Sequence, residues 1–118
     1  MTPPIRRLSS LATNSGGGPL LHASISHYPG DPDDLQSRYD AMLAEVPAEN
    51  MQLHLCLRAP DGLIVVDTCP SEEAFRGFHF GEGFRALRER HGLPAPDRIE
   101  DFPVSVAFAG GAALSTSG

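Results

Sequence analysis

The fold is decided by residues 62–92, which read GLIVVDTCPSEEAFRGFHFGEGFRALRERHG. Residues 63–66 are a short run of aliphatic and β-branched side chains, which is typical of a strand buried on both faces. Ser71 follows as a helix N-cap, because its hydroxyl can accept a hydrogen bond from a free backbone N–H group. Gly92 can adopt the left-handed conformation that ends a helix. The stretch therefore predicts a buried strand that leads into a capped helix.

The predicted helix after Ser71 has an apolar side made by Phe75, Phe78, Phe84 and Leu87. Glycines interrupt this helix at positions 77, 81 and 83. Each glycine inside a helix costs about 1 kcal/mol relative to alanine. We therefore expect a kink or a break near residues 80–83.

Two alternating stretches precede this unit and predict two further strands. In residues 51–58, Leu53, Leu55 and Leu57 fall on one side, and His54, Cys56 and Arg58 fall on the other. In residues 20–28, Leu21, Ala23 and Ile25 oppose His22, Ser24 and Ser26. The Pro-Asp-Gly turn at residues 60–62 predicts an antiparallel hairpin between residues 51–58 and the buried strand.

One more helix and one more strand complete the pattern. Residues 31–46 begin with Asp31 as a cap and Pro32 at the first helical position, and an apolar stripe follows until Pro47. Residues 99–108 alternate again and predict a last strand, in which Pro103 favours a position at the sheet edge.

The order strand, helix, strand, strand, helix, strand is that of the ferredoxin-like βαββαβ fold. This is an α+β fold, with a four-stranded antiparallel sheet and two helices on one face. We expect one such domain over residues 20–109. Flexible tails are expected over residues 1–19 and 110–118, which are rich in glycine and serine. Because one sheet face would be bare in a monomer, we also expect a homodimer packed sheet to sheet.

The composition excludes several classes of function. The 118 residues carry a net charge of −6 and no lysine, which argues against binding to nucleic acids or to anionic membranes. Neither a signal peptide nor a membrane span is recognisable, so we expect a cytoplasmic protein. The two cysteines and five histidines match no metal-ligand spacing, and we predict neither a metal nor another cofactor.

The sequence Val65-Val66-Asp67, followed by SEEAF at residues 71–75, resembles the strand-to-helix junction of the dimeric α/β-barrel superfamily. Phe102-Pro103-Val104 resembles small actinobacterial members of this group, and the likeness covers residues 20–108. The superfamily includes antibiotic-biosynthesis monooxygenases that use no cofactor, haem-degrading monooxygenases, lactone isomerases and stress-response proteins. The resemblance implies a ligand cavity between the sheet and the helices of each protomer.

This chain departs from the family pattern at two positions. Many members carry a tryptophan where this chain has Cys69. The position of the haem-ligating histidine falls near Arg88, whose guanidinium cannot bind haem iron. These two departures argue against haem chemistry and also against a monooxygenase activity.

Four residues are candidates for catalysis: His54, His22, His79 and Asp67. A neutral imidazole can act as a general base because its pKa lies near neutrality, and a carboxylate can orient it. Candidate substrate-binding residues are Phe75, Phe78, Phe84, Tyr39 and Arg58. For His22 and His54 the alternative is a place in the dimer interface, for His79 the helix–sheet core, and for Asp67 a turn cap. Cys69 lies close to a helix N-terminus, where the dipole would stabilise a thiolate, but no second cysteine is near enough in the sequence to indicate a redox function.

Two classes of function follow from these candidates. The first is a small enzyme without a cofactor that acts on a planar apolar or phenolic molecule. It would resemble a monooxygenase, or an isomerase or cyclase that moves a proton. The second is a non-catalytic dimer that binds a small molecule or acts in a stress response.

Overall fold

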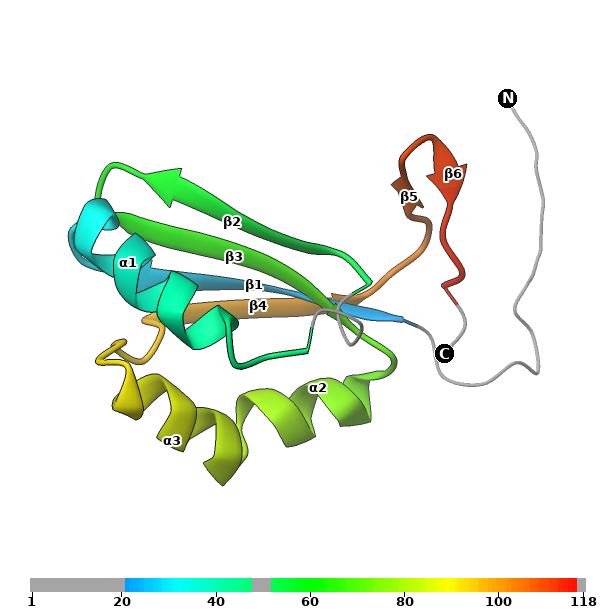
Figure 1. The fold of residues 1–118 in the computed structure, drawn as a ribbon. Coiled ribbons are helices and arrows are strands. Elements are labelled where there is room, and N and C mark those ends of the chain that lie inside the picture. The colour runs from blue at the N-terminus through cyan, green and yellow to red at the C-terminus, as the bar shows by residue number, and fades with distance from the viewer. Residues whose placement is uncertain (1–20, 48–51, 117–118) are drawn as a thin grey trace.

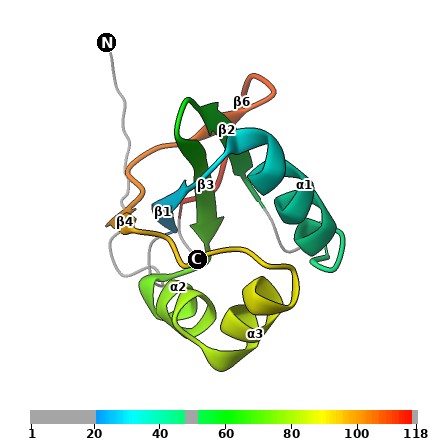
Figure 2. The same cartoon turned by 90° about the vertical axis from the view of Figure 1, so that its left-hand side faces the viewer.

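The computed structural model describes residues 21–47 and 52–116 of the chain. A four-stranded antiparallel sheet has the strand order β2-β3-β1-β4, and three helices cover one of its faces (Figures 1 and 2). The strands are β1 (His22–Pro29), β2 (His54–Ala59), β3 (Gly62–Cys69) and β4 (Arg98–Pro103). The helices are α1 (Pro32–Leu43), α2 (Glu72–His79) and α3 (Glu82–Arg90). This is the predicted ferredoxin-like α+β fold.

Strand β3 lies inside the sheet, between β1 and β2, as its run of aliphatic residues predicts. Leu63 and Val65 are buried on the side that faces the helices. The predicted hairpin joins β2 to β3, with Ala59 opposite Gly62 at the turn. Strand β4 is an edge strand, which agrees with the proline at its end.

Helix α1 begins as its sequence predicts. The carboxylate of Asp31 accepts a hydrogen bond from the backbone N–H of Asp34 at 2.9 Å, and Pro32 occupies the first turn. The buried residues of this helix are Leu35, Tyr39 and Met42, which lie on one stripe. This stripe carries Tyr39 inward, over the sheet.

The predicted long helix is broken into α2 and α3 at Phe80 and Gly81, inside the interval expected from the glycines. Ser71 caps α2 by accepting from the backbone N–H of Ala74 at 3.0 Å. At Gly81, a Cβ atom would collide with the backbone carbonyl oxygen of Gly77. The chain can therefore turn here only with glycine. Gly92, with φ of 73°, ends α3 as predicted.

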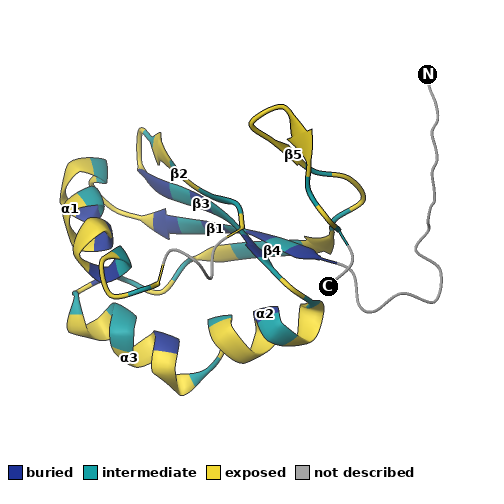
Figure 3. Cartoon of the chain, turned by 45° about the vertical axis from the view of Figure 1, so that its right-hand side comes forward, coloured by how far each residue is buried: buried dark blue, intermediate teal, exposed yellow. Residues whose placement is uncertain are grey.

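Strands β1 and β2 show the reverse of a simple amphipathic pattern. Ser24 and Ser26 of β1 are fully buried on the face that the helices cover. On the opposite face, Leu55 and Leu57 are 47% and 45% exposed. Figure 3 shows β2 as more exposed than β3, which lies beside it inside the sheet. Polar side chains of β1 therefore lie beneath the helices.

The last predicted strand is shorter than expected, because β4 ends at Pro103 and not at residue 108. The chain then turns away into a small hairpin of β5 (Phe108–Ala109) and β6 (Ala112–Ala113), which stands apart from the main sheet (Figure 1). Proline, which lacks an N–H donor, ends regular pairing here. The stretch predicted as a C-terminal tail thus contains β6, and Thr116 accepts a backbone hydrogen bond from Leu21 at 2.6 Å.

Two expectations concern residues outside the described ranges: the N-terminal tail over residues 1–19, and the beginning of the second strand at residue 51. Among the described residues, no helix is both long and apolar enough to cross a membrane.

Candidate functional site

A cavity of about 220 Å³ lies between the helices and the sheet. Apolar side chains from the helices and β3 form much of its wall: Met42, Leu43, Val46, Val65, Phe78 and Phe84. The polar residues that line it come mainly from α1, β2, β3 and α2: Tyr39, His54, Asp67, Cys69 and His79. A mostly apolar cavity with a few convergent polar groups is the usual form of a small-molecule site.

Three of these polar residues form a hydrogen-bonded chain. The Tyr39 hydroxyl lies 2.6 Å from Nε2 of His54, and Nδ1 of His54 lies 3.2 Å from Oδ1 of Asp67. Asp67 also accepts from the backbone N–H of Thr68 at 2.9 Å. Helix α1, strand β2 and strand β3 therefore each contribute one member, and pairing places His54 opposite Asp67.

The direction of this chain follows from the state of its tyrosine. Burial raises the pKa of Tyr39, so its hydroxyl keeps its proton and donates to Nε2 of His54. The remaining ring nitrogen, Nδ1, then carries a proton and donates to the carboxylate of Asp67. Both ring nitrogens of His54 are thus in use.

Two further polar groups lie beside this chain and take no part in it. His79 is buried between phenylalanine rings, and burial lowers its pKa while the nearby carboxylate of Asp67 partly opposes this effect. Its Nε2 atom lies 3.9 Å from Oδ2 of Asp67, which is too long for a hydrogen bond. Burial raises the pKa of the Cys69 thiol to about 11, and Asp67 adds to this. Both residues are uncharged near neutral pH.

The structure brings together six of the nine candidates: His54, Asp67, His79, Tyr39, Phe78 and Phe84. His22 is not among the residues that line the cavity. It faces the helices as well, but its Nε2 lies 2.7 Å from Oδ1 of Asp101 on β4. The alternative placements of His22 and His54 in a sheet-to-sheet interface are wrong, since both side chains face the helices.

Phe75 and Arg58 also do not line the cavity. Phe75 is fully buried and packs against the rings of His22 and His79, so it supports the site from behind. Arg58 is exposed and forms an ion pair with Asp33 of α1. The alternation of residues in β2 predicted the correct sheet face for Arg58. Because β2 is an edge strand, however, the long side chain of Arg58 reaches solvent and not the cavity.

From its sequence, Cys69 was considered only as a thiol near a helix N-terminus and not as a residue of the site. Its place in the site could have been predicted, because residues two apart in a strand point to the same face. Cys69 therefore had to share the face of Asp67. The bond between Tyr39 and His54 joins residues of different elements, and no spacing along the chain indicates it.

No family model matches the sequence, and no curated protein matches it. Among solved structures, the chain is similar to a protein from Chloroflexus aurantiacus J-10-fl that is named as an antibiotic biosynthesis monooxygenase. The TM-score is 0.54 at 13% sequence identity, and the match covers 78% of this chain and 99% of the other. At this identity the likeness concerns the fold. The chain thus has the ferredoxin-like fold of that protein, in agreement with the resemblance found in its sequence.

Proposed function

We propose that this protein is an enzyme that removes a proton from a planar apolar or phenolic small molecule held in the cavity. The observation that carries the proposal is the chain from Tyr39 through His54 to Asp67 at the wall of a largely apolar cavity. The fold shared with the Chloroflexus protein supports a monooxygenase-like reaction. An isomerase or cyclase reaction would use the same proton transfer.

In the proposed step, the acidic C–H or O–H group of the substrate gives its proton to the Tyr39 oxygen. Tyr39 gives its own proton to Nε2 of His54 at the same time, so the phenol is regenerated. The imidazolium that forms at His54 is stabilised by Asp67, whose carboxylate is already hydrogen-bonded to Nδ1. The apolar wall keeps water away from the resulting substrate anion.

Exchange of substrate hydrogen for deuterium tests this step without knowledge of the final product. A panel of phenols and enolisable ketones is incubated with the protein in D₂O and followed by NMR, with dioxygen uptake recorded in parallel. We expect exchange on at least one compound, and a loss of about 100-fold or more in His54→Ala. Dioxygen uptake would favour oxygenation, and exchange without uptake would favour isomerisation.

The matched control is His91→Ala, which removes a histidine that is bonded to Glu45 at the surface, away from the cavity lining. This variant should exchange at the wild-type rate. Full exchange in a folded His54→Ala protein would contradict the proposal. Binding of a panel compound without any exchange would favour the other class of function, a non-catalytic small-molecule-binding protein.

We further propose that the protein is a cytoplasmic homodimer that buries the open face of the sheet. Leu55, Leu57 and Phe102 expose large apolar areas there, and exposed apolar patches of this kind mark interfaces. Both cysteines of the chain are free thiols, which agrees with a reducing compartment.

A further inference from the structure

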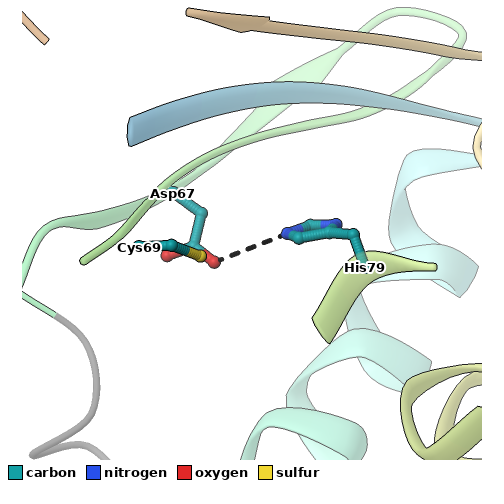
Figure 4. A group of neighbouring side chains, drawn as sticks. All are labelled: Asp67, Cys69 and His79. Atoms are coloured by element: carbon teal, nitrogen blue, oxygen red, sulfur yellow. Dashed lines mark ion pairs between the residues drawn. The ribbon is translucent and has the colours of Figure 1, made fainter. Parts of the chain in front are cut away.

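One corner of the cavity holds three side chains that could act as metal ligands, and two of them, Cys69 and His79, take no part in the proposed proton transfer. A carboxylate oxygen of Asp67, Sγ of Cys69 and a ring nitrogen of His79 all lie within 4.8 Å of one another. Figure 4 shows Asp67 and Cys69 reaching from β3 toward the ring of His79 on α2. An oxygen, a sulfur and a nitrogen donor thus converge on one point.

The fold holds these groups in place. Asp67 and Cys69 are two residues apart in β3 and therefore share one face of the strand. His79 lies in the last turn of α2, and its ring is fixed between Phe75 and Phe84, at centroid distances of 4.7 and 5.4 Å. The convergence therefore depends on packed elements and not on flexible loops.

His79 supplies an independent sign that something binds here. Its side chain is only 5% exposed, and among the described residues Nε2 has no hydrogen-bond partner. A buried polar atom without a partner destabilises the fold unless a ligand satisfies it. Nε2 faces Oδ2 of Asp67 at 3.9 Å, too far for a hydrogen bond, and in a neutral imidazole this atom can carry the lone pair. A lone pair in this state is a metal ligand.

We propose that Asp67, Cys69 and His79 bind one divalent transition-metal ion of the zinc type. Carboxylate, thiolate and imidazole are the three ligand types that zinc accepts, and the thiolate excludes magnesium and calcium as preferred ions. In a tetrahedral zinc site the ligand atoms are about 3.3–3.8 Å apart, so small side-chain movements close the present spacing. Binding displaces the thiol proton of Cys69 into solvent.

Three protein ligands leave the fourth position of a tetrahedral ion open, which is the arrangement of catalytic zinc sites. Oδ1 of Asp67 remains hydrogen-bonded to His54, so its carboxylate would join the ion to the proton-transfer chain. Spacing along the sequence hides the site because two ligands come from β3 and one from α2. This inference goes beyond the proposed function, since neither Cys69 nor His79 takes part in the proton transfer.

Cobalt(II) is the probe that tests the site. The full chain without an affinity tag, reduced and stripped with a chelator, is titrated with Co²⁺ while absorbance is recorded and native mass spectrometry counts the ions. We expect one ion per chain and a thiolate-to-cobalt charge-transfer band. Cys69→Ser should abolish the band, whereas Cys56→Ser, which removes the other free thiol, should retain it. Absence of the band and of the mass adduct in the folded wild type would overturn the proposal, as would loss of the band in Cys56→Ser alone.

A second measurement needs no variant. Alkylation of the two thiols of the wild type is followed by peptide mass spectrometry with and without Zn²⁺. Zinc should slow alkylation of Cys69 by about ten-fold or more and leave Cys56 unchanged. Equal rates at Cys69 with and without zinc would refute the site. Deuterium exchange by the stripped protein would show, independently, that the proposed function stands even if the metal site fails.

Discussion

Tyr28 is a buried phenol whose raised pKa makes the stability of the protein depend on pH in the alkaline range. It is 3% exposed in β1, and burial raises its pKa from 10.0 to about 12. The folded protein therefore holds the phenol proton more tightly than the unfolded chain does. This stabilisation is fully present below pH 10 and is lost as the pH rises toward 12.

The expected consequence is a difference in alkaline stability between the wild type and Tyr28→Phe. Between about pH 9 and about pH 12, the wild type should lose about 2–3 kcal/mol more of its free energy of unfolding than the variant does. Tyr39 is present in both proteins, but ionised Tyr28 also raises the pKa of Tyr39, so the difference includes this coupling between the two phenols. Urea unfolding at a series of pH values measures it, and parallel pH curves for the two proteins would contradict this account.

At the scale of single residues, three of the residues that line the cavity were predicted from their places in the sequence. His54 lies on the polar face of its strand, His79 lies among phenylalanines, and Asp67 ends a buried strand. His22 and Arg58 were predicted as site residues too, but they do not line the cavity. Alternation in a strand indicates which face a residue occupies, and both do share the face of His54. It does not show the position along that face, which depends on strand order and on where the helices lie.

At the scale of elements, the break between helices α2 and α3 can be tested with two glycines, because one of them is crowded by the backbone and the other is not. A Cβ at Gly81 would meet the carbonyl oxygen of Gly77, whereas a Cβ at Gly83 would meet no atom within 4 Å. Gly81→Ala should therefore lower the free energy of unfolding by about 2 kcal/mol. Gly83→Ala should raise it by about 0.5–1 kcal/mol, because alanine favours the helix.

Chemical denaturation of the two variants measures this contrast. Both proteins carry the same added methyl group, so each is the control for the other. Equal stability changes would show that the close approach at Gly81 is not what breaks the helix. The expected loss in Gly81→Ala should come with weaker binding in the cavity, since His79 lies just before the break.

The order of the helices and strands was predicted better than the question of which sheet face the helices cover. The order of helices and strands, the hairpin at Gly62 and the break near Gly81 all follow from local signals: caps, turns and glycines. The faces of the sheet do not, because Leu55 and Leu57 have the pattern of a core and yet lie opposite the helices. An apolar stripe indicates burial against something, and only the three-dimensional arrangement shows whether that partner belongs to the same chain.

At the scale of the whole molecule, this open apolar face predicts self-association. Leu57→Glu places a charge in the middle of the proposed interface, where burying it without a partner is costly. We expect the wild type to sediment as a dimer at micromolar concentration and Leu57→Glu to sediment as a monomer. Ser37→Glu adds the same charge at an exposed position of α1 and should leave the dimer intact. A monomeric wild type would contradict the proposed assembly.

The central claim is that Tyr39, linked through His54 to Asp67, moves a proton in this cavity. The most direct test is the rate of deuterium exchange into a bound substrate in Tyr39→Phe, a variant that keeps the aromatic ring and removes only its oxygen. We predict that exchange falls by about 100-fold or more while the affinity for the compound stays within about two-fold of the wild type. An unchanged exchange rate in this variant would contradict the claim.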